Sequence, residues 1–215
     1  MTPRPLTVGD LDKTSFQSWY GRWCPLDPAG VAALLAGSGV SWWIAGGWAA
    51  RVGAAPRHHE DIDVAAALAD LPALRAHLES ALHLWEAHDG SLRPLLPGQE
   101  LRPGREQLWL RRDSGSAWEV DVLLHAGEAG EWVFKRDSTV RLPWDRALHT
   151  VDGIRYLRPE LALLHKAHLD RPKGRADLAA AVLEPGARAW LITQLQQRGH
   201  DTWASIAGRS SDAAS

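Results

Sequence analysis

One short stretch constrains the fold more than any other: residues 42–67, WWIAGGWAARVGAAPRHHEDIDVAAA. It opens with a continuous apolar run that ends at Gly46 and Gly47, a pattern typical of a buried strand followed by a tight turn. The residues after the turn predict a brief helix. In the strand-like segment that follows, apolar residues alternate with Asp61 and Asp63, which places both carboxylates on one face.

A second strand repeats this acidic alternation. In WEVDVLL, residues 118–124, Glu119 and Asp121 share a face. If the two strands pair, Asp121 lies beside Asp61 and Asp63. Like charges 4 Å apart repel by about 4 kcal/mol at an effective dielectric near 20, and two Mg²⁺ ions about 3.5–4 Å apart would remove that repulsion. The alternative is a solvated sheet face with no bound ion.

The glycine pair favours the first interpretation. Glycine lets a bulky anion approach the backbone, and a strand–turn–helix segment aims N–H groups at it. Gly46 and Gly47, followed by paired aspartates and a later aspartate on an adjoining strand, are the features of a site for a nucleoside triphosphate.

The segment IAGGWAARVGAAPRHHEDIDV resembles the signature of the polymerase-β-type nucleotidyltransferases. More narrowly, it is similar to the aminoglycoside 2''-adenylyltransferase and lincosamide nucleotidyltransferase groups. The resemblance covers about residues 40–178. It departs from the wider superfamily at Trp48, where serine or threonine is usual. The matching residues are Gly46, Gly47, Trp48, Arg57, His59, Asp61, Asp63 and Asp121.

The resemblance, together with the charged residues around the matching segment, implies roles for individual residues. The catalytic and metal-binding residues would be Asp61, Asp63 and Asp121, with Mg²⁺ as the cofactor, two ions being expected. Asp121 would complete the metal site or accept a proton, and Glu119 is an alternative base or a plain surface acid. The nucleotide-binding residues would be Gly46, Gly47, Arg57, His59, Lys166 and Lys173, with Asp177 orienting a lysine. The competing interpretation of Gly46 and Gly47 is a simple turn. For Arg57 and His59 it is a solvated loop, and Lys166 and Lys173 would then be ordinary surface lysines.

The implied activity is that of a metal-dependent nucleotidyltransferase. It would move a nucleoside monophosphate, AMP being expected, from a nucleoside triphosphate such as ATP to a hydroxyl of a small acceptor, releasing pyrophosphate. An aminoglycoside- or lincosamide-like antibiotic is the first expectation for the acceptor. One alternative is a toxin-like enzyme acting on tRNA or protein, for which the arginines at 102, 105, 111 and 112 are the only local basic cluster. The other is an inactive domain that binds a nucleotide or a partner.

Composition agrees with a cytoplasmic α/β protein. The 215 residues carry a net charge of −2 and a single cysteine, and no apolar run reaches the ~20 residues of a membrane helix. We expect a small mixed β-sheet nucleotidyltransferase domain backed by helices over residues 1–157, with a lead-in at 1–24. A C-terminal helical extension at 158–207, containing three helical segments, and a flexible tail at 208–215 would follow. Gly and Pro residues predict a long loop at 89–106. The oligomeric state is left open.

Overall fold

The computed structural model describes residues 11–55, 57–125 and 130–209. The chain forms two compact units, each taken from two separate stretches of sequence. Unit 1 comprises the described residues within Met1–Trp42 and Glu60–Ala126, and unit 2 those within Trp43–His59 and Gly127–Ser215. This division cuts the chain differently from the expected boundary at residues 157 and 158.

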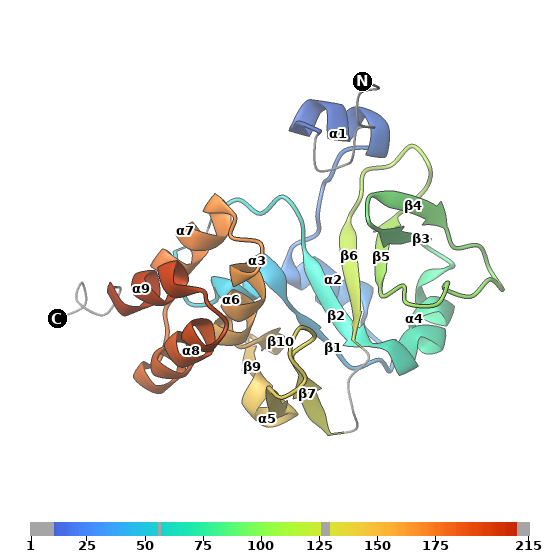
Figure 1. Ribbon diagram of the computed structural model, residues 1–215. Coiled ribbons are helices and arrows are strands. Elements are labelled where there is room, and N and C mark those ends of the chain that lie inside the picture. Colours follow the sequence, from blue (N-terminus) through green and yellow to red (C-terminus); the bar gives the residue numbers. More distant parts are fainter. Residues whose placement is uncertain (1–10, 56, 126–129, 210–215) are drawn as a thin grey trace. The chain divides into compact units, whose positions relative to one another are not determined.

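Unit 1 is built on strands in the order β4-β3-β5-β6-β2 (Figure 1). β2 and β6 run parallel, whereas β6, β5, β3 and β4 pair antiparallel to their neighbours. The register places Asp63 of β2 opposite Asp121 of β6, so the expected pairing of the two acidic strands is confirmed. The strands are β2 (Asp63–Ala67), β3 (His83–His88), β4 (Ser91–Pro94), β5 (Gln107–Arg111) and β6 (Val120–His125).

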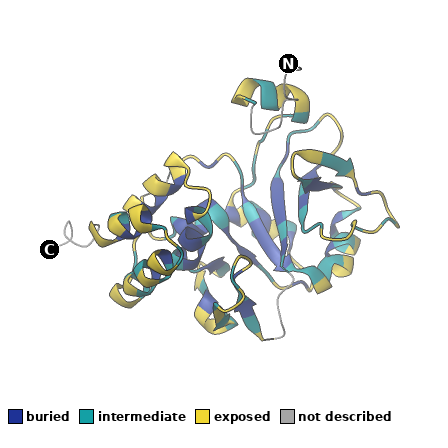
Figure 2. Cartoon of the chain, in the orientation of Figure 1, coloured by how far each residue is buried: buried dark blue, intermediate teal, exposed yellow. Residues whose placement is uncertain are grey.

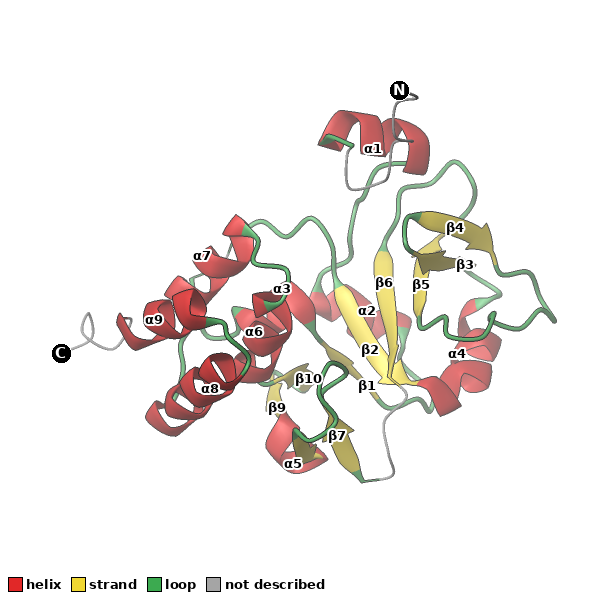
Figure 3. Ribbon diagram, in the orientation of Figure 1, coloured by secondary structure: helices red, strands yellow, loops and turns green. Residues whose placement is uncertain are grey.

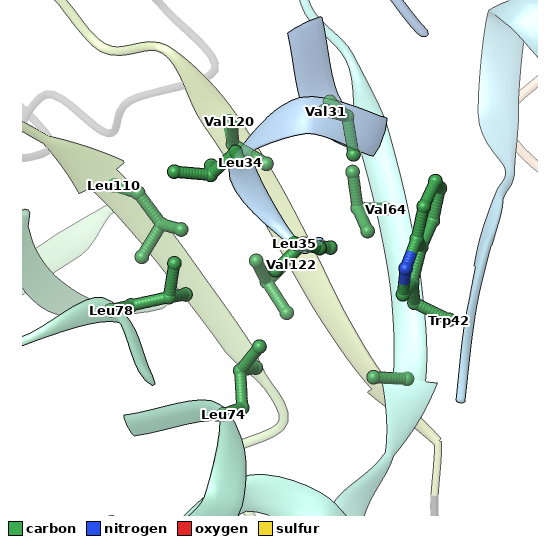
Figure 4. A pocket seen from close by; sticks show the side chains of 11 residues that line it. Val31, Leu34, Leu35, Trp42, Val64, Leu74, Leu78, Leu110, Val120 and Val122 are labelled. Atoms are coloured by element: carbon green, nitrogen blue, oxygen red, sulfur yellow. The ribbon is translucent and has the colours of Figure 1, made fainter. Parts of the chain in front are cut away.

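The apolar core of unit 1 lies between one face of these strands and two helices, α2 (Pro28–Leu34) and α4 (Leu71–Leu78). Asp27 caps α2 by accepting a hydrogen bond of 2.7 Å from the Gly30 backbone N–H, as its position before Pro28 predicts. A gap of about 10 Å³ between the helices and the strands is room for one water at most (Figure 4). Its walls are apolar, so it belongs to the packed core. The lining residues are Val31, Leu34, Leu35, Trp42, Val64, Ala66, Leu74, Leu78, Leu110, Val120 and Val122.

The predicted loop at 89–106 is partly wrong, because β4 occupies residues Ser91–Pro94 and pairs with β3. Asp89 and Gly90 connect the two strands, both with positive φ, 43° and 74°. Two successive positive φ values form the turn that matches the twist of a hairpin, and Asp-Gly is a strong sequence signal for it. The prediction gave weight to the many Gly and Pro residues and overlooked this pair.

Unit 2 contains a short sheet in the order β1-β10-β9 and a separate hairpin of β7 and β8. Asp152 and Gly153 form the turn between β9 and β10, with φ values of 51° and 78°. The elements are β1 (Trp42–Ile44), α3 (Gly46–Ala50), β7 (Glu131–Val133), β8 (Arg141–Pro143), α5 (Trp144–Ala147), β9 (Leu148–Val151) and β10 (Ile154–Leu157).

The chain becomes helical after residue 157, as predicted (Figure 3). Three of these helices start with a proline at the first helical position, where its missing N–H has no intrahelical partner to lose. The helices are α6 (Pro159–Ala167), α7 (Pro172–Ala180), α8 (Pro185–Gln197) and α9 (Asp201–Arg209). The prediction of three helical segments is therefore one short. Most of the predicted tail, from residue 210 onward, lies outside the described residues.

Buried residues are concentrated in the strands and on the inner sides of the helices (Figure 2). In β2 and β6 most residues are buried, and α6 buries Leu161 and Leu163 completely. No helix in the described part of the chain is long and apolar enough to cross a membrane.

Candidate functional site

Two of the three predicted carboxylates, Asp63 and Asp121, lie on adjacent strands of unit 1, and the third, Asp61, lies just before β2. We call Asp61, Asp63 and Asp121 the acid row. Asp63 and Asp121 are register partners in the parallel ladder of β2 and β6, so their side chains project from the same face. The ladder continues before Asp63, because the Asp121 backbone N–H donates to the Ile62 carbonyl at 3.0 Å. Asp61 precedes β2 by two residues, and it is near enough to Asp121 for its charge to contribute to raising the pKa of that carboxyl. The face that carries Asp63 and Asp121 is opposite to the apolar core.

Asp121 is the buried member of the acid row, with 8% of its surface exposed. Its carboxylate accepts hydrogen bonds from Gln107 Nε2 at 2.9 Å (Oδ1) and 2.7 Å (Oδ2). Burial, together with the nearby charges of Asp63 and Asp61, raises the pKa of Asp121 well above its ordinary value, and the Gln107 hydrogen bond opposes the rise. Burial and the neighbouring carboxylates therefore disfavour the charged form of Asp121.

The acid row is not a preformed three-ligand cation site. Within residues 11–55, 57–125 and 130–209, no three His, Cys, Asp or Glu side chains are close enough together to bind one metal ion as they stand. The donor set does suit Mg²⁺, which prefers carboxylate oxygens and is commonly held by one or two carboxylates plus water and substrate phosphate. Asp63 and Asp121, facing each other across the ladder, provide such a pair.

Glu119 is already paired, because Arg112 Nε donates to its Oε1 at 2.9 Å. Two more of the four arginines at 102, 105, 111 and 112 also have side-chain partners. Arg102 binds the buried Glu86 carboxylate. Arg111 is buried, with its guanidinium carbon 4.4 Å from the centroid of the Trp85 ring and 4.2 Å from that of Trp118. These arginines serve the structure of unit 1.

The predicted nucleotide-binding residues lie in unit 2, where Gly46 and Gly47 begin α3. Gly46 has φ 55°, a conformation that favours glycine. A Cβ at Gly47 would lie 2.9 Å from Arg57 Nη2 and 3.0 Å from His59 Nδ1. The glycine thus allows two basic side chains to approach the backbone at the start of α3.

A buried carboxylate, Asp177 on α7, joins two of these residues. Its Oδ1 accepts from Arg57 Nε at 2.8 Å and its Oδ2 accepts from Arg57 Nη2 at 3.1 Å, while Lys166 Nζ lies 3.2 Å from Oδ2. Burial tends to raise the pKa of Asp177, but the hydrogen bonds from Arg57 and the charge of Lys166 lower it below its ordinary value. Gly47, Arg57, His59, Lys166 and Asp177 together form what we call the basic cluster.

Two predicted residues have different surroundings. Lys173 lies on the exposed surface of α7. Trp48 stacks on His59 with ring centroids 4.2 Å apart and an interplanar angle of 17°, so it packs within unit 2. Sequence reasoning missed Gln107, because a lone glutamine at the start of a strand carries no motif.

Comparison with known proteins supports the resemblance seen in the sequence. A family model described as aminoglycoside-2''-adenylyltransferase matches residues 29–94. A crystal structure of ANT(2'')-Ia in complex with adenylyl-2''-tobramycin aligns over 86% of this chain and 95% of that chain, with 14% identity and a TM-score of 0.41. A solution structure of the antibiotic-resistance factor ANT(2'')-Ia aligns over 86% and 90%, with 16% identity and a TM-score of 0.38. No curated protein matches the chain. The matched segment contains Gly46, Gly47, Arg57, His59, Asp61 and Asp63, so the expected resemblance to the aminoglycoside 2''-adenylyltransferases is confirmed.

Proposed function

We propose that the chain is a nucleotidyltransferase that moves AMP from ATP to a hydroxyl group of a small acceptor. A bond forms between the acceptor oxygen and the α-phosphorus, the bond from that phosphorus to the bridging oxygen breaks, and pyrophosphate leaves. The observation that carries the proposal is the direct pairing of Asp63 with the buried Asp121 on adjacent parallel strands.

In unit 1 the acid row would hold Mg²⁺. When bound, the ion neutralises phosphate charge and orients the triphosphate. Asp61 and Asp63 would contribute carboxylate oxygens, and Asp121 would either share the ion or accept the proton of the acceptor hydroxyl. The concentration of charge around Asp121 supports a cation here, since a buried carboxylate beside two others is stabilised by positive charge.

In unit 2 the basic cluster would bind the phosphates of the triphosphate. Two cations, Arg57 and Lys166, share a single carboxylate, Asp177, which leaves net positive charge beside the backbone opened by Gly47. Arg57 also has a planar guanidinium that suits bidentate contacts to phosphate oxygens. Lys173, exposed on the same helix as Asp177, would be an additional point charge.

The acceptor is proposed as an aminoglycoside-like antibiotic because of the family that matches residues 29–94. An RNA acceptor would require a basic surface that is open to bind phosphates. The arginines at 102, 111 and 112 are held by Glu86, two tryptophan rings and Glu119, so this alternative has little support.

The test is transfer of label from each α-labelled nucleoside triphosphate, with Mg²⁺, to a panel of aminoglycosides, lincosamides and RNA. We expect adenylylation of a small hydroxylated acceptor. Asp63→Asn should reduce kcat more than about 100-fold, because it removes a proposed direct ligand of the ion. Loss of a residue that only hydrogen-bonds a ligand costs at most about 100-fold. Glu119→Gln serves as the matched control, since its carboxylate is paired with Arg112, and it should retain most activity. Transfer that survives Asp63→Asn, or its absence with every triphosphate and acceptor, would contradict the proposal.

A further inference from the structure

Gln107 holds both oxygens of Asp121 and has no assigned role. Its side-chain Nε2 lies 2.9 Å from Oδ1 and 2.7 Å from Oδ2. Gln107 is on β5, where Trp109, not Gln107, is the register partner of Asp121. The glutamine therefore reaches diagonally across the ladder, a separation that long side chains can span.

This contact holds the carboxylate from the side of β5. A carboxylate has about four lone-pair sites, and one amide group can occupy at most two of them. Gln107 approaches from β5, whereas Asp63 is the partner of Asp121 on β2, the strand on the opposite side of β6. The Asp121 carboxylate on β6 therefore has the Gln107 amide on the side of β5 and the Asp63 side chain on the side of β2.

The chemistry of the donor matters as much as its position. A lysine or arginine at residue 107 would form an ion pair with Asp121 and cancel the charge that attracts a cation. A glutamine amide is neutral, so it orients the carboxylate and leaves its charge in place. Carboxylates that ligate metals are commonly hydrogen-bonded in this way by an outer residue.

We propose that Gln107 is a positioning residue that orients the Asp121 carboxylate to share a divalent cation with Asp63. The inference rests on the proposed function for the presence of the cation. It also assigns Asp121 to the ion, one of the two roles that the proposed function allows. Gln107 itself would touch neither the ion nor the substrate.

The test measures Mn²⁺ binding to the full chain by electron paramagnetic resonance of the free ion, without nucleotide. Gln107→Leu removes the donor and keeps the approximate size, and should weaken Mn²⁺ affinity about 10- to 100-fold. Gln107→His retains an N–H donor at similar reach and should restore affinity to within about threefold of the native protein. Gln196→Leu, on the exposed face of α8 in unit 2, is the matched control and should change nothing. Asp63→Asn should abolish binding, which assigns the signal to the acid row.

Thermal unfolding without metal separates positioning from a purely structural role, since Gln107→Leu should then unfold within a few degrees of the native protein. Mn²⁺ affinity that is unchanged in Gln107→Leu, equally weakened in Gln107→Leu and Gln107→His, or unaffected by Asp63→Asn would overturn the inference. So would the absence of Mn²⁺ binding to the native chain. Asp63-dependent Mn²⁺ binding without nucleotide transfer would defeat the proposed function alone.

Discussion

Gly47 shows how a single missing side chain organises the basic cluster. The space that a Cβ would take is bordered by Arg57 Nη2 at 2.9 Å and His59 Nδ1 at 3.0 Å, and real Cβ atoms essentially never have contacts shorter than 3.0 Å. Movement of either neighbour disturbs another contact, because Arg57 is held by Asp177 and His59 stacks on Trp48. An added methyl group must therefore displace a residue that has other partners.

We expect Gly47→Ala to weaken binding of a nucleoside triphosphate by about tenfold, or about 1.4 kcal/mol, because it moves Arg57 away from the backbone. Isothermal titration with a non-hydrolysable ATP analogue and Mg²⁺ measures the change. Gly186→Ala is the matched control, since a Cβ there meets nothing within 4 Å and the residue lies in the first turn of α8. The control should leave affinity unchanged and stabilise the fold by about 0.4–1 kcal/mol. Equal affinity in the two variants would contradict this role for Gly47.

At the scale of elements, Trp203 anchors α9 to the region of α7. Its ring is buried and lies 3.0 Å from where a Cβ of Gly174 would be. Its indole N–H donates to Asp170 Oδ1 at 2.7 Å, and Arg175 Nε donates to the same oxygen at 2.7 Å. The hydrogen bond from Arg175, followed by that from Trp203, lowers the pKa of Asp170 to about 2. The Asp170 carboxylate thus links the turn before α7 to α9.

This link predicts an acid-sensitive contribution to stability. The folded pKa of Asp170 is below its unfolded value of about 3.9, so the stabilisation is fully present above that value and is lost as pH falls toward about 2. We expect Asp170→Asn to lower the melting temperature at pH 6, and the difference from the native protein to narrow as pH is reduced from about 5 to 3. Asparagine suits the test because Asp170 has φ 46°, which asparagine tolerates. A difference that stays constant with pH would show that its charge is not involved.

The elements also show which parts of the structure the sequence could predict. Alternation predicted that the acids of each strand share a face, whereas the pairing of the two strands was a condition that the structure fulfils. The contact between Arg57 and Asp177 joins residues 120 positions apart. No local sequence pattern specifies which of the many distant carboxylates an arginine will bind. The contact of Gln107 with Asp121 could not be predicted for the same reason, because it depends on the register of β5 against β6. α9 was not predicted, because its buried residues are Trp203 and the two small residues Ala204 and Ala207, which give only a weak apolar pattern.

On the scale of the whole molecule, the predicted site residues are divided between the two units. The acid row belongs to unit 1, and the basic cluster belongs to unit 2. The chain passes from one unit to the other between His59 and Glu60, directly before Asp61. The segment that most constrained the sequence analysis is therefore the segment in which the chain leaves unit 2 and enters unit 1.

The net charge of the chain bears on whether the acceptor is a small molecule or RNA. The chain has 24 basic and 26 acidic residues, for a net charge of −2, which gives no overall attraction to a phosphate backbone. We expect labelled tRNA to bind no more tightly than about 10⁻⁶ M at physiological salt, the range of non-specific binding. Fluorescence anisotropy at about 50 and 200 mM salt measures both the affinity and its salt dependence.

Substituting two arginines of the 102–112 group, Arg105 and Arg112, completes this test. Arg112→Ala combined with Arg105→Ala should leave adenylylation of a small acceptor unchanged, because neither residue belongs to the acid row or the basic cluster. Binding of tRNA near about 10⁻⁸ M, the affinity of specific complexes, that weakens steeply with salt and is lost in the double variant would favour the RNA acceptor instead. The comparison separates the two acceptors because binding of a phosphate backbone needs several exposed cations, whereas binding of a small hydroxylated acceptor does not depend on these arginines.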